Sequence, residues 1–103
     1  MDTVVYRQGD VFIIPIKEQV NTAMRSARRS VLAEGEVTGH AHRVGDPKTA
    51  DVFTSAGEMF LDVVAAESTI THEEHGPITL PKGLYKVRIQ REYSPEEIRR
   101  VID

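Results

Sequence analysis

Apolar and polar residues alternate along much of this chain, which predicts strands in preference to helices. Tyr85, Val87 and Ile89 alternate with polar residues, the pattern of a strand with one buried and one solvent-facing side. Residues 11–16 are instead apolar on both faces, which is typical of an interior strand. We expect that strand to end near Pro15, because proline cannot donate a hydrogen bond to a neighbouring strand.

Further short stretches also have strand character and are separated by turn-forming residues. They are residues 31–33, 40–44, 52–54, 59–64, 68–72 and 78–80. Glycine, proline and aspartate punctuate them at short and fairly even intervals. This spacing predicts a single all-β domain over residues 1–103, folded as a small barrel or jelly roll.

The end of the chain has the pattern of a short helix. Ser94 is a suitable N-cap, a proline follows at the first helical position, and Glu97 completes a capping box. Apolar residues then recur at helical spacing. We therefore expect a helix over residues 95–102 that packs on the sheet or on a neighbouring subunit.

Composition and charge place the chain among soluble globular proteins. Its 103 residues are 40% hydrophobic and 28% charged, enough for one domain with a modest core. No stretch approaches the roughly 20 apolar residues of a membrane span, and the N-terminus lacks the pattern of a signal peptide. We expect a cytoplasmic protein without a membrane partner. The net charge of -3 argues against a broad nucleic-acid-binding surface, and the cluster of Arg25, Arg28 and Arg29 is assigned no role.

All four histidines fall in two short clusters, His40-Ala41-His42 and His72-Glu73-Glu74-His75. On a strand, His40 and His42 share one face because residues two apart point the same way. His72 extends the inward face of its own strand. His75 joins His72 only if the chain turns between them, which the following Gly-Pro pair favours. The two clusters therefore predict a common pocket.

These residues suit a divalent metal ion. The chain has no cysteine, so nitrogen and oxygen donors are the available ligands, and they suit zinc, iron, manganese or nickel. Such an ion would activate water or polarise a small-molecule substrate. The predicted ligands are His40, His42, His72 and His75, and the predicted oxygen ligands or proton acceptors are Glu73, Glu74 and Asp46.

Two other interpretations stay open at this point. In the first, two imidazoles near Lys82 or Arg91 act without metal as an acid and a base, cleaving or transferring a phosphoryl group. In the second, the protein is a non-catalytic binding or assembly module, a phage or accessory component, and the histidines hydrogen-bond within the fold or across an interface. We expect a homo-oligomer in each case, since small β-domains often cover sheet edges by self-association.

Two stretches of the sequence have a recognisable motif pattern. Gly35, the His40-Ala41-His42 triplet and Asp46 are similar to the first cupin motif, a glycine followed by HxH and an acidic residue. Gly76 and the Pro81-Lys82-Gly83 triplet resemble the second motif. The chain has Asp46 where the cupin pattern has a glutamate, and its second motif lacks the usual final histidine. The resemblance implies a cupin-like barrel or jelly roll.

A second resemblance runs over most of the chain. The stretches 8–11, 32–43, 71–77 and 90–93 are similar to an uncharacterised family of small bacterial and phage proteins. The common pattern is Gly-His-Ala-His followed later by His-Glu-Glu-His-Gly-Pro. This resemblance implies no particular activity.

Overall fold

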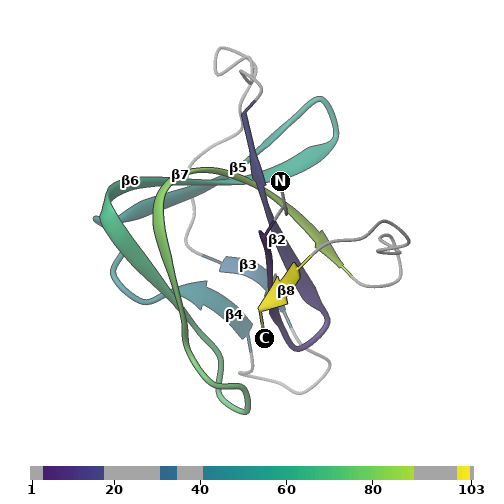
Figure 1. The fold of residues 1–103 in the computed structure, drawn as a ribbon, viewed down its shortest axis with the longest axis vertical. Coiled ribbons are helices and arrows are strands. Elements are labelled where there is room, and N and C mark those ends of the chain that lie inside the picture. The colour runs from purple at the N-terminus through teal and green to yellow at the C-terminus, as the bar shows by residue number, and fades with distance from the viewer. Residues whose placement is uncertain (1–3, 18–30, 35–40, 90–99, 103) are drawn as a thin grey trace.

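The computed structural model describes residues 4–17, 31–34, 41–89 and 100–102. Within these ranges all the regular secondary structure is β, and the strands form one sheet (Figure 1). The strands are β1 (Val4–Gln8), β2 (Val11–Ile16), β3 (Val31–Glu34), β4 (Ala41–Val44), β5 (Ala50–Ser55), β6 (Glu58–Thr71), β7 (Ile78–Ile89) and β8 (Arg100–Ile102). The all-β prediction is therefore confirmed for the described part of the chain.

The sheet is open. Its strand order is β3-β4-β6-β7-β2-β1-β8, with β5 paired to β6. The pairs are antiparallel apart from β1 and β8, which run parallel. In the described ranges β3 and β8 stand at opposite ends of this order, so the predicted closed barrel is wrong. Alternation identifies strands and their buried faces, but it does not decide whether the two edges of a sheet pair with each other.

Two strands of the structure are long and bent, and each joins two stretches that the sequence predicts as separate strands. The stretches 59–64 and 68–72 belong to β6, and 78–80 continues through Pro81-Lys82-Gly83 into β7. The β6–β7 register shifts between Val63 and Glu67, which marks a β-bulge, and bulges bend strands without ending them. The backbone N–H groups of Val64 and Ala65 both donate to the carbonyl of Thr49 there.

The C-terminal helix is a second correction. Arg100–Ile102 form strand β8, which pairs with Val4–Tyr6 of β1, whereas residues 95–99 lie outside the described residues. Val101 and Ile102 are β-branched, and such side chains favour strands. The free edge of β1 offers their backbone hydrogen-bond partners, and this tertiary contact overrides the helical spacing seen in the sequence.

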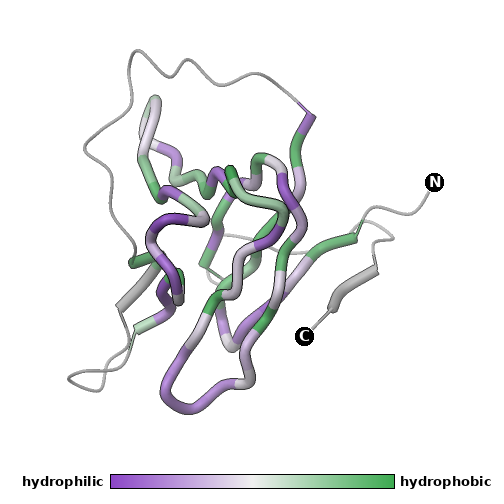
Figure 2. Tube along the Cα trace, turned by 90° about the vertical axis from the view of Figure 1, so that its left-hand side faces the viewer, coloured by the Kyte–Doolittle hydropathy of each residue, from purple (hydrophilic) through white to green (hydrophobic). Residues whose placement is uncertain are grey.

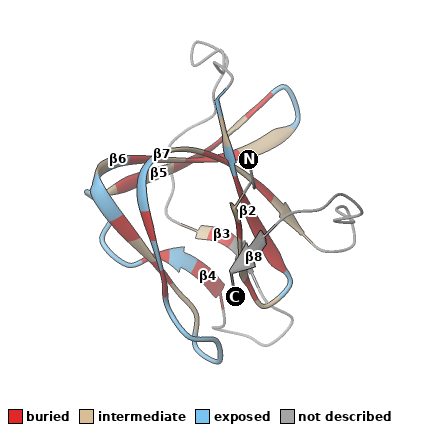
Figure 3. Ribbon diagram, viewed as in Figure 1, coloured by how far each residue is buried: buried red, intermediate tan, exposed pale blue. Residues whose placement is uncertain are grey.

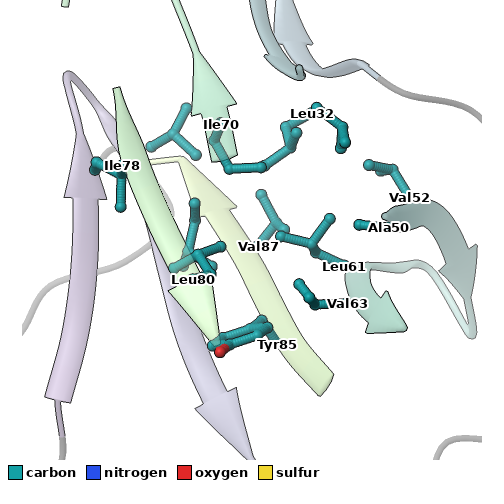
Figure 4. Close-up of a cluster of buried hydrophobic side chains, with 13 residues drawn as sticks. Leu32, Ala50, Val52, Leu61, Val63, Ile70, Ile78, Leu80, Tyr85 and Val87 are labelled. Carbon is teal, nitrogen blue, oxygen red and sulfur yellow. The ribbon is translucent and has the colours of Figure 1, made fainter. Parts of the chain in front are cut away.

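The core lies between the inner faces of the curved sheet (Figure 4). Val11 and Ile13 of β2 join this main cluster, while Phe12 and Ile14 pack with Val5 in a smaller cluster on the other face. β2 is thus buried on both faces and lies between β1 and β7, as its sequence predicts. It continues past Pro15 to Ile16.

The alternation predicted for β7 is confirmed at Tyr85 and Val87, whereas Ile89 is half-buried like Arg88. Tyr85 and Val87 are buried, at 3% and 5% exposure, with the half-buried Lys86 between them. Figure 2 shows that hydrophobic and hydrophilic segments alternate along the described parts of the chain. Buried positions follow the inner strands, and the chain between β6 and β7 is exposed (Figure 3).

Three segments far apart in the sequence meet toward the lower end of Figure 1. They are the β1–β2 turn, strand β4 and the bend between β6 and β7. The bulge in β6 curls its second half, with the start of β7, back toward the β1–β2 turn. We call this junction the seam, and it contains the histidines.

Candidate functional site

Three of the four histidine rings lie in contact at the seam. The ring centroid of His42 is 4.3 Å from that of His72 and 5.9 Å from that of His75. The centroids of His72 and His75 are 4.7 Å apart. The two histidine clusters thus meet in space. His40, the fourth predicted ligand, lies outside the described residues.

The alternation of β4 places His42 inside. His42 and Val44 are each 3% exposed, and Arg43 between them is exposed. This is the two-residue period of a strand with one buried face. His42 is therefore a buried side chain, whereas His72 is half-buried and His75 is exposed.

Glu73 attaches the bend to β4. Its Oε2 accepts a hydrogen bond from the backbone N–H of Ala41 at 2.9 Å, and its Oε1 lies 3.2 Å from the guanidinium of Arg43. The Ala41 N–H is the main reason that the pKa of Glu73 is lowered, and the charge of Arg43 adds to it. Both carboxylate oxygens therefore have partners in β4, which indicates a positioning role.

Gln8, at the end of β1, holds His42 in one tautomer. The Gln8 side chain is 2% exposed, and its Nε2 donates to the carbonyls of Ile70 and Gly76, each at 2.9 Å. Two carbonyl acceptors identify that atom as the amide nitrogen, so Oε1 faces His42 Nδ1 at 2.9 Å. An amide oxygen only accepts, so Nδ1 carries the hydrogen and Nε2 of neutral His42 keeps a lone pair.

Gly9 and Asp10, in the β1–β2 turn, lie next to the histidine rings. Asp10 Oδ1 lies 3.7 Å from His42 Nε2. Gly9 has a φ of +60°, and a Cβ at this position would come within 2.6 Å of His75 Nε2. Among the sequence predictions, residues 8–11 contribute to the family resemblance, but none of them is a candidate site residue. No local pattern marks Gln8 or Asp10 as part of a site, because their partners in the seam lie far away along the chain.

His72 has the opposite hydrogen-bonding pattern from His42. Its Nδ1 accepts a hydrogen bond from the backbone N–H of Glu74 at 3.0 Å. A backbone N–H can only donate, so Nδ1 of His72 holds a lone pair and the neutral ring carries its hydrogen on Nε2. The two adjacent imidazoles, when neutral, are therefore different tautomers.

The environment keeps His42 neutral. Its pKa is lowered from 6.5 to about 4, mainly by burial and then by the charge of His72, with His75 contributing in the same direction. Asp10 and Glu73 oppose this shift without cancelling it. At neutral pH His42 therefore offers an uncharged nitrogen donor.

Other residues singled out in the sequence lie elsewhere. Asp46 closes its own turn, with Oδ1 accepting from the backbone of Lys48, and Lys82 is exposed in β7. Arg91, like Arg25, Arg28 and Arg29, lies outside the described residues. Over the described ranges, no group of three or more histidine and carboxylate side chains is already arranged to hold a metal ion. The nearest arrangement is the pair formed by His42 and Asp10.

Comparison with known proteins gives a family for this chain. A family model described as a domain of unknown function, DUF8820, matches residues 7–90. No curated protein and no solved structure gives a significant match. Among the described residues, no helix is long and apolar enough to span a membrane. The match covers β1 from Arg7, strands β2 to β7 and the whole seam, and the chain therefore belongs to the DUF8820 family.

Proposed function

We propose that the seam binds a divalent metal ion and that this ion serves small-molecule chemistry such as metal-assisted hydrolysis. The observation that carries the proposal is the Gln8–His42–Asp10 arrangement. Gln8 accepts the Nδ1–H of His42, and the opposite ring nitrogen faces the carboxylate of Asp10.

This arrangement is typical of metal-binding histidines. Such a histidine usually donates its other ring N–H to a carbonyl or carboxylate, which fixes the tautomer and the orientation of the ring. Gln8 supplies that acceptor, and its own amide is held by two backbone carbonyls. Burial keeps His42 neutral, and a neutral imidazole is the form that binds a metal.

The spacing of the two donors also supports the proposal. Ligand atoms about 2.1 Å from a tetrahedral ion lie about 3.4 Å apart. The separation of His42 Nε2 and Asp10 Oδ1 is 3.7 Å, so a small side-chain movement brings both atoms onto one ion. His75 is the nearest exposed candidate for a third donor, with His72 and His40 as the other predicted ligands.

The acidic residues of the bend take different roles in this proposal. Glu73 positions the bend through Ala41 and Arg43. Glu74 is exposed beside the histidines, and it is the proposed proton acceptor for metal-bound water. The donor set contains only nitrogen and oxygen, which suits zinc, manganese, nickel or iron.

Metal content and affinity test the proposal. Untagged protein is analysed for bound metals, stripped with a chelator, and titrated calorimetrically with zinc and manganese. We expect one ion per chain in the wild type and at least about tenfold weaker binding in His42→Gln and Asp10→Asn, as for changes in metal-site residues. Asp62→Asn, a half-buried carboxylate in β6, is the matched control and should bind normally. Wild-type protein that binds neither ion would overturn the proposal.

A second candidate is a non-catalytic module in which the histidines only stabilise the seam. The observation that favours it is that His42 is 3% exposed and already hydrogen-bonded by Gln8. Metal-free protein whose melting temperature does not change in excess zinc or manganese would support this candidate. A cupin-like jelly roll, a phage or bacterial origin, self-association and a cytoplasmic location also stay predictions. Light scattering after size-exclusion chromatography tests the self-association.

A further inference from the structure

A pocket opens where the β5–β6 hairpin separates from β7. The β6–β7 pairing ends at Met59 and Val87. From there β6 stays paired with β5 as far as Glu58, whereas β7 stays paired with β2 as far as Ile89. The diverging strands leave an open pocket of about 210 Å³, lined from β3, β5, β6, β7 and the β5–β6 turn. That turn lies at the upper end of Figure 1 and the seam at its lower end, so the pocket is separate from the seam.

Much of the pocket lining is apolar. Leu32 of β3 and Val87 of β7 are buried members of the main core cluster (Figure 4), and the half-buried Met59 packs against that cluster. Ile89 adds a fourth apolar side chain to the lining. A cavity of about 150 Å³ holds a benzene ring, so this pocket has room for an aliphatic chain of roughly six to eight carbons.

The charged residues at this pocket carry more positive than negative charge. Glu58 and Arg88 both line it, and Glu58 Oε1 accepts a hydrogen bond from Nη2 of Arg88 at 2.6 Å. The same oxygen lies 3.4 Å from Nζ of Lys86. Within the described ranges, Glu58 is the one carboxylate that forms an ion pair with either cation. Two positive charges therefore share one negative charge, and a ligand with one carboxylate would balance them.

We propose that this pocket binds a small amphipathic monocarboxylate, an aliphatic acid of roughly six to eight carbons. Its chain lies against Leu32, Met59 and Val87, and its carboxylate pairs with Arg88 beside Glu58. An arginine carries five N–H donors in a planar fork, and Glu58 accepts from one of its terminal nitrogens, so the same guanidinium can bind a second carboxylate. The site is independent of the metal site proposed at the seam.

Titration of the wild-type protein with octanoate is the first experiment. At neutral pH, calorimetry should show saturable binding of one octanoate per chain. Butyrate should bind at least about tenfold more weakly, because each buried methylene strengthens binding about fourfold. Octanol, which has the same chain without the charge, should also bind about tenfold more weakly. The methyl NMR signals of Leu32, Met59 and Val87 should shift on binding.

Two variants test the charged partner. Arg88→Gln should bind octanoate about tenfold more weakly than the wild type, the usual scale for a lost hydrogen bond to a charged group, and should bind octanol equally well. Lys48→Gln, which removes an exposed charge in the β4–β5 turn, is the matched control and should bind both ligands normally.

Several results would overturn the proposal. Wild-type protein that shows no saturable octanoate binding at millimolar concentrations, or NMR shifts confined to other parts of the chain, would refute the pocket as a binding site. An Arg88→Gln variant that binds octanoate as tightly as the wild type would refute the carboxylate contact. If that variant also loses octanol, its pocket is disturbed, and the wild-type comparison decides: equal affinity for octanoate and octanol refutes the contact.

Discussion

Replacing Gln8 with leucine tests whether this amide holds the seam together. Gln8 is 2% exposed and makes three hydrogen bonds, to His42 Nδ1 and to the carbonyls of Ile70 and Gly76. Leucine fills a similar volume but makes none of them. His42 and Ile70 are buried and would keep unsatisfied polar groups, whereas Gly76 is exposed and can bind water instead.

The magnitude follows from these two buried groups. Each unsatisfied buried donor or acceptor costs about 1–3 kcal/mol, so Gln8→Leu should lower the free energy of unfolding by about 4 kcal/mol. That is a large part of the roughly 5–15 kcal/mol that stabilises a typical domain. Urea denaturation followed by circular dichroism measures the difference directly.

A control and a double variant make the test specific. Thr79→Val removes an exposed side-chain hydrogen bond between Thr69 and Thr79 and should change stability by less than about 0.5 kcal/mol. A Gln8→Leu/His42→Phe variant also lacks the buried imidazole N–H. It should therefore lose less stability than the sum of the losses measured for the two single variants. If Gln8→Leu costs no more than the Thr79 control, the Gln8 amide does not hold the seam together.

Three further predictions concern pH, the turn glycine and the metal. The pKa of His42 is near 6.5 in the unfolded chain and about 4 in the folded one. As pH falls, the unfolded chain therefore takes up the proton first. The contribution of His42 to the free energy of unfolding is thus fully present above pH 7 and declines toward pH 4. Metal-free wild type should lose about 2 kcal/mol between pH 7 and pH 5 that His42→Gln does not lose; equal losses in urea denaturation would contradict this. Gly9→Ala should cost about 1–2 kcal/mol for a side chain at positive φ and displace the His75 ring, which lies 2.6 Å from the added Cβ, so weaker zinc binding is expected in calorimetry, and unchanged stability would refute the reasoning. Finally, zinc at about 100 times its dissociation constant should stabilise the wild type by about 2.7 kcal/mol, seen as a higher melting temperature that a chelator reverses. At the same zinc concentration His42→Gln, which binds at least about tenfold more weakly, should gain no more than about 1.4 kcal/mol. An equal response in that variant would place the ion elsewhere.

The sequence pattern predicted most strands correctly because burial in a sheet has a period of two residues. β2 and β7 show this directly, through an apolar run buried on both faces and through the alternation of Tyr85 and Val87 with polar residues. It failed where a strand continues through turn-forming residues. At Pro81-Lys82-Gly83 the pairing with β6 outweighs the local turn preference, and the strand bends without ending.

The C-terminal prediction failed for a different physical reason. The capping residues around Ser94 describe only local preference, and a short helix depends on packing for most of its stability. Val101 and Ile102 instead pair with β1. That edge comes from the other end of the sequence, so no local pattern reveals it.

The site was predicted in part. The close spacing within each histidine cluster indicated a pocket, and His42, His72 and His75 do lie together. Gln8 and Asp10 could not be found in this way. Their importance comes from the curl of β6 and β7, which brings the bend onto the β1–β2 turn, and a glutamine or an aspartate in a turn carries no such information by itself.

The long sequence separations at the seam have a consequence for when the seam forms during folding. Gln8 contacts residues 34, 62 and 68 positions away through its three hydrogen bonds. Contacts of such high order require the closure of long loops, which slows folding and leaves these contacts absent from partly folded chains. A ligand that binds at the seam therefore binds only the native state, and its binding free energy adds fully to the free energy of unfolding.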